Sequence, residues 1–269
     1  MRSLSAVPGG VDLGLWVSVP AYTGEIKVET AHSLNVEMLE AFNKKIPYLL
    51  TFHEQDSIIT RCRNAMVMNF LDSDPKAFTD MVFVDSDVGF PPGALLRLAA
   101  HPVDIVGGCY PFRNDPIGFP ATFRKAQAGG PDTVLDPATG LLEMSGLPAG
   151  FLKIGRAALT KIMERFPDYF YNEENVPQKK AWRFFEFINM DHKFFGEDYA
   201  FCALAREAGL QIWCDTNITL KHVGMKQFIG NLQMWIEEKT APPPADPMAA
   251  IIDFNEKLAS GALKFKAAA

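Results

Sequence analysis

Cysteine is scarce in this chain of 269 residues, which has four cysteines and no Cys-x-x-Cys pair. A zinc site built on paired cysteines and a disulfide framework are therefore not expected. We expect buried, reduced thiols and hence a cytoplasmic protein. The four residues stand far apart, each in apolar or small-residue surroundings: Cys62, Cys109, Cys202 and Cys214.

Long apolar runs and an excess of basic residues are absent as well. No stretch of the sequence has the about 20 consecutive apolar residues that cross a bilayer, so we expect no membrane span. Residues 1–20 lack a basic segment followed by a long apolar run, and no signal peptide is expected. The formal net charge of −6 argues against a protein that coats nucleic acid, because phosphate binding favours a basic surface. A local basic patch remains compatible with that charge.

The rest of the composition is ordinary for a globular protein, with 48% apolar and 22% charged residues. The length fits one large domain or two small ones. In the first half, short apolar runs alternate with candidate helices. We expect strands over residues 13–20, 46–52, 81–84 and 103–108, and helices over 32–43, 57–71 and 91–100. This alternation predicts an α/β fold in which helices cover both faces of a mostly parallel sheet.

After Tyr110 the alternation becomes irregular. Glycines and prolines crowd residues 126–140, which favours loops or a hairpin, and residues 166–195 are rich in aromatics without clear periodicity. Elements that resume the fold are expected over residues 150–154 and 211–214 as strands, and over 156–165 and 197–208 as helices.

The C-terminal part differs in composition from the rest. Residues 241–247 are rich in proline, which is typical of a semi-rigid linker, and a short amphipathic helix is expected over 248–265. We predict one α/β domain over residues 1–230, followed by a proline-rich linker and a helical tail over 231–269.

Two carboxylates directly follow the strand expected over residues 81–84. Asp85 and Asp87 are separated only by Ser86, and ligands of parallel sheets gather at the carboxyl ends of the strands. Two such carboxylates repel each other unless a cation lies between them, and oxygen ligands favour Mg²⁺ or Mn²⁺. The sequence therefore predicts a metal–phosphate site, with capping of the next helix as the alternative. A second triplet, residues 72–74, lies in a polar turn and is interpreted as a solvated loop.

Three further elements are candidates for chemistry. Glu197 and Asp198 begin an expected helix, where they either cap it or supply a general base. His222 is either a satisfied core or surface histidine or a ligand that completes the coordination of a cation. Gly146 and Gly150 bracket either a plain tight turn or a backbone that lets an acceptor or phosphate approach closely.

In this order the motifs resemble the GT-A glycosyltransferases, which are nucleotide-sugar-dependent enzymes with a Rossmann-like fold. The Asp85–Asp87 triplet is similar to their Asp-x-Asp motif, residues 146–150 to their glycine loop, and residues 196–198 to their x-Glu-Asp motif. His222 is similar to their late metal-binding histidine. The likeness extends over residues 16–224 and is greatest to phage-type and bacterial members, and more distant to fungal mannan-polymerase subunits. A phage-encoded chain would act in the host cytoplasm.

The resemblance implies a role for each motif. Asp87 binds Mn²⁺ or Mg²⁺ directly, Asp85 reaches the ribose, the ion or a metal-bound water, and His222 closes the metal shell. Asp198 is the expected catalytic base, and Glu197 orients the acceptor or the loop. The donor is expected to be a UDP- or GDP-sugar. The residues expected to contact this nucleotide are Pro20, Tyr22, Thr23, Glu25, Arg61, Asp85, Ser86 and Gly150. For Arg61, whose guanidinium suits phosphate, the alternative is a solvated helix charge.

The reaction needs a cation that stabilises the departing diphosphate and a base that activates an acceptor hydroxyl. If Asp198 deprotonates the acceptor hydroxyl on the face opposite the leaving group, the anomeric configuration inverts, but the fungal relatives retain it, so the stereochemistry stays open. The acceptor also stays open among saccharides, lipid-linked sugars and proteins. Residues 177–187 interleave basic and aromatic side chains, which suits stacking on sugars or bases as well as core packing. The phage-type likeness adds a hydroxymethylated DNA base, presented by flipping.

Two other classes of protein remain as alternatives. A nucleotidyltransferase or sugar-nucleotide hydrolase also uses a metal, but the former would need a glycine-rich, lysine-bearing phosphate loop, which residues 21–25 do not form. A catalytically silent nucleotide-binding module would be expected to lack Asp198 or His222, and both are present.

Overall fold

The computed structural model describes residues 13–124, 134–172, 180–190 and 192–240. The chain divides into two units, residues 1–233 and 234–269, and the fold below is that of the first. The linker over 241–247 and the helix over 248–265 lie outside the described residues, as does most of the glycine- and proline-rich stretch over 126–140.

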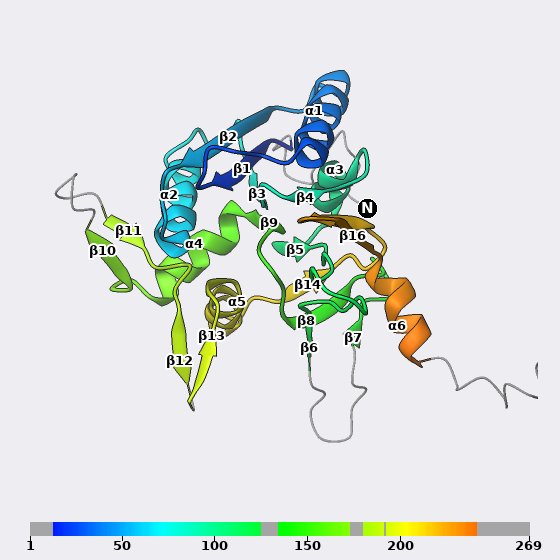
Figure 1. The fold of residues 1–269 in the computed structure, drawn as a ribbon. Coiled ribbons are helices and arrows are strands. Elements are labelled where there is room, and N and C mark those ends of the chain that lie inside the picture. The colour runs from blue at the N-terminus through cyan, green and yellow to red at the C-terminus, as the bar shows by residue number, and fades with distance from the viewer. Residues whose placement is uncertain (1–12, 125–133, 173–179, 191, 241–269) are drawn as a thin grey trace, which may run out of the picture. The chain divides into compact units, whose positions relative to one another are not determined.

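A nine-stranded sheet forms the centre of the fold, in the order β2-β1-β3-β9-β5-β14-β8-β6, with β7 also paired to β8 (Figure 1). Neighbours β2, β1 and β3 are parallel, as are β5 and β14, whereas β9 and β8 run antiparallel to their neighbours. The predicted α/β class with a mostly parallel sheet is confirmed. The strands are β1 Leu15–Ala21, β2 Tyr48–Glu54, β3 Asp80–Val84, β5 Ile105–Gly107, β6 Thr122–Phe123, β7 Val134–Leu135, β8 Leu142–Gly146, β9 Phe151–Gly155 and β14 Ile212–Cys214.

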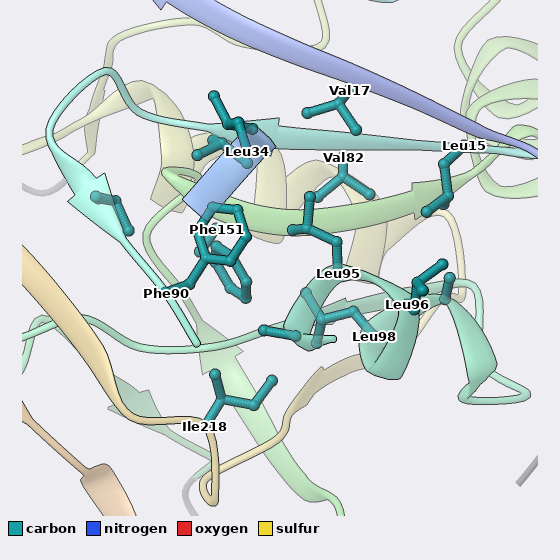
Figure 2. Close-up of a cluster of buried hydrophobic side chains, with 14 of the residues drawn as sticks. Leu15, Val17, Leu34, Val82, Phe90, Leu95, Leu96, Leu98, Phe151 and Ile218 are labelled. Atoms are coloured by element: carbon teal, nitrogen blue, oxygen red, sulfur yellow. The ribbon is translucent and has the colours of Figure 1, made fainter. Parts of the chain in front are cut away.

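Helices cover both faces of this sheet because alternate strand residues point to opposite sides. Val17 and Val82 face α1 and α3, where they meet Leu34 and Leu95 in a buried cluster (Figure 2). On the other face, the ring of Phe83 lies 5.4 Å from that of Phe185. Helices α2, α4 and α5 contact this second face. The helices are α1 Val28–Asn43, α2 Ile59–Leu71, α3 Ala94–Ala100, α4 Arg156–Arg165, α5 Glu197–Glu207 and α6 Leu232–Thr240, the last crossing the boundary between the two units.

The main departure from the expected topology is β9, which enters between β3 and β5 in the antiparallel direction. The alternation of strands and helices predicted that successive strands would be parallel. The same pattern cannot show that β9, which comes later in the chain, inserts between β3 and β5. Every residue of β3 and β9 is buried. Lys153 on β9 is buried too, and its amine donates to the carbonyl oxygens of His101 and Val103 at 3.3 and 2.6 Å.

The irregular segment over 166–195 contains two hairpins that its periodicity did not predict. They pair β10 (Phe170–Asn172) with β11 (Lys180–Trp182) and β12 (Ile188–Met190) with β13 (Lys193–Phe195). Strands of three residues are too short for an alternating pattern to show.

The start of α1 and the segment after β14 also differ from the sequence expectation. Helix α1 begins at Val28 rather than His32. Its N-terminal part is held by tertiary contacts, since the Lys27 amide donates to the carbonyl of Ser86 at 2.8 Å and the Ser33 hydroxyl donates to that of Phe90 at 2.7 Å. After β14 a small sheet follows, in the order β16 (Gln227–Gly230), β15 (Leu220–Val223) and β4 (Val88–Gly89).

The four cysteines are buried and unpaired, as predicted. Among the described helices, none combines the length and the apolar character that crossing a membrane requires.

Candidate functional site

A cleft of about 660 Å³ lies where β1, β3 and β5 end. Its wall contains residues that follow these strands, together with residues from α2, the start of α5 and β15. The residues predicted for the site that line it are Pro20, Tyr22, Thr23, Asp85, Ser86, Asp87, Glu197 and His222. The lining residues that the sequence did not single out are Asp56, Ile59, Cys62, Arg63, Tyr110 and Arg113.

Asp87 and His222 meet in this cleft, with 3.7 Å between Asp87 Oδ1 and His222 Nε2. The small sheet brings them together, because His222 on β15 pairs with Val88 on β4, directly after Asp87. His222 Nδ1 lies 2.8 Å from the carbonyl oxygen of Pro111. A carbonyl only accepts, so Nδ1 is the donor and Nε2 presents its lone pair toward Asp87.

The environment of His222 favours the neutral imidazole. Burial lowers its pKa from the ordinary value and the positive charge of Arg113 lowers it further, whereas the bond to Pro111 and the charge of Asp85 act in the opposite direction. A neutral imidazole with a free Nε2 lone pair is the form that binds metal ions.

Asp87 and His222 are the residues of the cleft that could hold a divalent ion. Two ligands about 2.1 Å from one ion lie about 3.0 Å apart when adjacent and about 4.2 Å apart when opposite, and 3.7 Å falls between these limits. Within the described part of the chain, no group of three or more His, Cys, Asp and Glu side chains could hold a metal. Mg²⁺-type ions commonly use one or two protein ligands and complete their shell with water and substrate phosphate.

Both carboxylate oxygens of Asp85 have partners on the protein. Arg63 Nη2 donates to its Oδ1 at 2.8 Å, and the Tyr110 hydroxyl donates to its Oδ2 at 3.3 Å. Its amide donates to the carbonyl of Gly150 at 2.9 Å. A Cβ added at Gly150 would lie 2.2 Å from Asp85 Oδ2, so this glycine makes room for the carboxylate. Gly150 thus shapes the site from behind Asp85 and does not itself line the cleft.

Arg63 is the central residue that the sequence analysis missed. It is only 4% exposed and its guanidinium lies 5.1 Å from the ring centre of Phe83. Besides Asp85 it contacts Glu197, with 3.4 Å between Nε and Oε1. Its position on α2 could have indicated this, because it follows the same helical stripe as the buried residues Met66 and Phe70.

Arg61, the arginine predicted for the diphosphate, lies outside the residues that line the cleft. Its side chain is 55% exposed and donates from Nε and Nη2 to Asp56 at 2.9 and 2.8 Å. Residues two apart on a helix do not face the same side, which is why Arg63 is buried where Arg61 is exposed. Glu25 is also exposed, in the loop after β1, and does not line the cleft.

Glu197 and Asp198 occupy the first turn of α5, and their environments differ. Glu197 lines the cleft beside Arg63, whereas Asp198 is half-buried and is not among the lining residues. Burial, together with the charge of Glu197, raises the pKa of Asp198 to about 6. Its Oδ1 accepts the amide of Tyr199 at 2.8 Å. A carboxyl with a pKa near neutral pH suits proton transfer, because it is ionised at pH 7 and still basic enough to accept a proton.

The fold and the cleft define an α/β protein with a carboxylate–histidine pair beside the carboxyl ends of its strands. No protein-family model matches the sequence, and no curated protein matches it either.

Two solved structures show a distant likeness to the chain. A197 from STIV has a TM-score of 0.47 and 15% identity, covering 79% of this chain and 86% of that chain. The catalytic domain of Drosophila β1,4-galactosyltransferase 7 in complex with xylobiose has a TM-score of 0.40 and 13% identity, covering 76% of this chain and 66% of that chain. Neither likeness says what this chain binds.

Proposed function

We propose that this protein is a metal-dependent glycosyltransferase that moves a sugar from a nucleotide-diphosphate sugar to an acceptor hydroxyl. The observation that carries the proposal is the meeting of Asp87 Oδ1 and His222 Nε2, 3.7 Å apart, in a polar cleft at the ends of the parallel strands. Ligands of open α/β sheets bind at this edge.

In this proposal, different residues of the cleft bind the metal ion, the nucleoside and the ribose of the donor. Asp87 and His222 hold Mn²⁺ or Mg²⁺, which supplies positive charge to the diphosphate leaving group when bound. The nucleoside of a UDP- or GDP-sugar lies along Pro20, Tyr22 and Thr23, where the exposed ring of Tyr22 can stack on a base. Asp85 reaches the ribose, held in place by its hydrogen bonds from Arg63 and Tyr110.

The acceptor side is assigned to the start of α5. Asp198 removes the proton from the acceptor hydroxyl, which its raised pKa permits at neutral pH. Glu197 is held by Arg63 and orients the acceptor or the adjoining loop. A saccharide and a hydroxymethylated base in DNA are both acceptors to be tried.

The test of donor binding is thermal unfolding with Mn²⁺ alone and with Mn²⁺ plus UDP, GDP or CDP. A ligand that binds only the folded protein raises the Tm, by linkage. We expect a rise with one of these nucleotides that requires Mn²⁺. No shift with any of the three would contradict the proposal. The nucleotide that shifts the Tm then selects the nucleotide-sugars for assays against mixed saccharides and DNA with hydroxymethylated bases.

The test of the base is Asp198→Asn, compared with Asp168→Asn at an exposed position of the loop after α4. Asp198→Asn should keep the nucleotide-dependent Tm shift and lower sugar transfer by about 10²-fold or more, because the amide cannot accept the proton. Asp168→Asn should change neither. Unchanged turnover in the Asp198 variant would remove this residue from the mechanism.

A further inference from the structure

We propose that Arg113 is a second cationic contact for the diphosphate, beside the divalent ion held by Asp87 and His222. This inference rests on the proposed function and adds the residue that takes the role first expected of Arg61. Arg113 stands in the loop after β5 and lines the cleft.

The first observation is that Arg113 and His222 share Asp87. Arg113 Nη2 contacts Asp87 Oδ2, while His222 Nε2 faces Oδ1 of the same carboxylate. The guanidinium therefore lies next to the place where the ion would bind. A phosphate group that binds an ion there also comes within reach of the arginine, and guanidinium groups bind phosphate oxygens with paired hydrogen bonds.

The second observation is that the loop is built to hold Arg113 in this place. The Phe112 amide donates to the carbonyl of Gly118 at 2.8 Å, and Pro111 accepts the hydrogen bond from His222. Beyond Arg113, Lys226 pairs with Asp115 and ties the loop to the hairpin of β15 and β16.

Gly224 supports the same placement from the hairpin side. A Cβ added at this glycine would lie 3.1 Å from Arg113 Cδ, so the absence of a side chain leaves room for the arginine to pass. The stem of Arg113 thus runs over Gly224, and its guanidinium reaches Asp87 in the cleft.

The third observation concerns the other arginines near the cleft. Arg63 is buried between aromatic rings, and two carboxylates, Asp85 and Glu197, balance its charge. Arg61 does not line the cleft, and its guanidinium is paired with Asp56. The side chain of Arg113 is 42% exposed, and it keeps donors besides Nη2 for an incoming ligand. A half-exposed pair such as Arg113–Asp87 contributes little to stability, so rearranging it around a bound anion costs little free energy.

The positive charge of Arg113 should affect the binding of Mn²⁺ in opposite directions without and with the diphosphate. With Mn²⁺ alone, the charge of Arg113 repels the ion and competes for Asp87. With diphosphate present, the arginine and the ion attract the same group. Arg113→Ala should therefore strengthen the binding of Mn²⁺ alone by about three-fold. It should weaken the binding of the manganese pyrophosphate complex by about ten-fold, the loss expected for one charge-assisted hydrogen bond.

The experiment measures Mn²⁺ binding by the loss of the free-ion electron paramagnetic resonance signal, and binding of manganese pyrophosphate by calorimetry. Inorganic pyrophosphate serves as the probe because its binding does not depend on the nucleobase. Arg206→Ala is the matched control, since it removes one positive charge at an exposed position in the last turn of α5. It should leave both affinities within two-fold of the wild type.

The outcomes separate this inference from the proposed function. Opposite changes in the two affinities, confined to Arg113→Ala, support it. Equal affinities of wild type and Arg113→Ala, or a loss of both, would overturn this inference alone while metal binding by Asp87 and His222 stands. No Mn²⁺ binding by any of the three proteins would overturn the proposed function together with it.

Discussion

At the scale of single residues, the partners of a carboxylate decide its chemistry more than its motif does. Asp85 and Asp87 are two positions apart, yet Asp85 accepts hydrogen bonds from Arg63 and Tyr110 while Asp87 faces His222 and Arg113. The sequence could place both at the sheet edge because a buried strand ends there. It could not assign them different partners, because those partners come from three separate segments: α2, the loop after β5, and β15.

Asp198 also contributes to the pH dependence of stability. Its pKa is 3.8 in the unfolded chain and about 6 in the folded protein, so the folded state binds the proton more tightly. The ionised carboxylate therefore destabilises the fold as pH rises through this window. Asp198→Asn should raise the free energy of unfolding by about 2 kcal/mol at pH 7.5 and by much less at pH 4.

Urea unfolding of wild type and Asp198→Asn at pH 4 and pH 7.5 measures this difference. Asp168→Asn, at the exposed position, should show the same small effect at both pH values. An equal gain at both pH values for the Asp198 variant would mean that ionisation of this group does not destabilise the fold.

At the scale of secondary structure elements, the antiparallel strand β9 shapes the site. It pairs with β3 along its whole length, from Asp80 opposite Gly155 to Val84 opposite Phe151. This register places Gly150 directly behind Asp85. The sequence predicted that Gly150 serves a tight turn or the close approach of a ligand. In the structure, Gly150 instead leaves space for the carboxylate of Asp85.

Gly150→Ala tests this contact. The new Cβ would meet Asp85 Oδ2 at 2.2 Å and the Tyr110 hydroxyl at 2.7 Å, so these groups must move. We expect a destabilisation of about 1–3 kcal/mol, as for overpacking of a core. We also expect weaker binding of the nucleotide that shifts the Tm, because Asp85 loses its position.

The control for this variant is Gly118→Ala, where the added Cβ would meet the Phe112 ring at 3.6 Å, an ordinary contact. Denaturant unfolding and nucleotide titration are measured on both variants. A Gly150→Ala protein with the stability and nucleotide affinity of Gly118→Ala would show that Asp85 does not depend on this glycine.

At the scale of the whole molecule, an ionic cluster around the buried Asp215 should contribute to the response to acid. Asp215 is 1% exposed and follows β14. It accepts hydrogen bonds from Arg97 at 2.5 and 3.0 Å and lies 2.9 Å from His101 Nε2, which joins α3 to the sheet. Burial alone would raise its pKa, but the hydrogen bonds from His101 and Arg97 and the charge of Arg97 outweigh burial and lower the pKa to about 2.

Because the folded-state pKa lies below the unfolded value of 3.8, the ionised Asp215 stabilises the fold above that value. This stability, about 2 kcal/mol, is lost as pH falls from about 5 to 2. Asp215→Asn should therefore unfold more easily at pH 6 and lose less further stability on acidification. Unfolding followed by circular dichroism from pH 6 to pH 2 measures both effects. If wild type and variant lose the same amount of stability between pH 6 and pH 2, the acid sensitivity does not come from Asp215.

Much of the fold was predictable from local pattern. The runs before Pro20 and Asp85 are largely apolar, as is typical of strands buried on both faces, and they occur where expected as β1 and β3. The short strands of the two hairpins and the insertion of β9 were not predictable, because a strand of three residues shows no period and strand order depends on distant pairing.

The amino-acid sequence by itself determined the class of the fold, the buried strand that ends in Asp85 and Asp87, and the free, buried cysteines. These follow from properties that neighbouring residues share, such as periodicity and apolar runs. Only the tertiary structure decided that His222 reaches Asp87, that Arg63 rather than Arg61 is buried beside Asp85, and that Arg113 joins the cleft. These contacts bring together residues far apart along the chain, and the strand pairing of β15 with β4 and of β9 with β3 creates them.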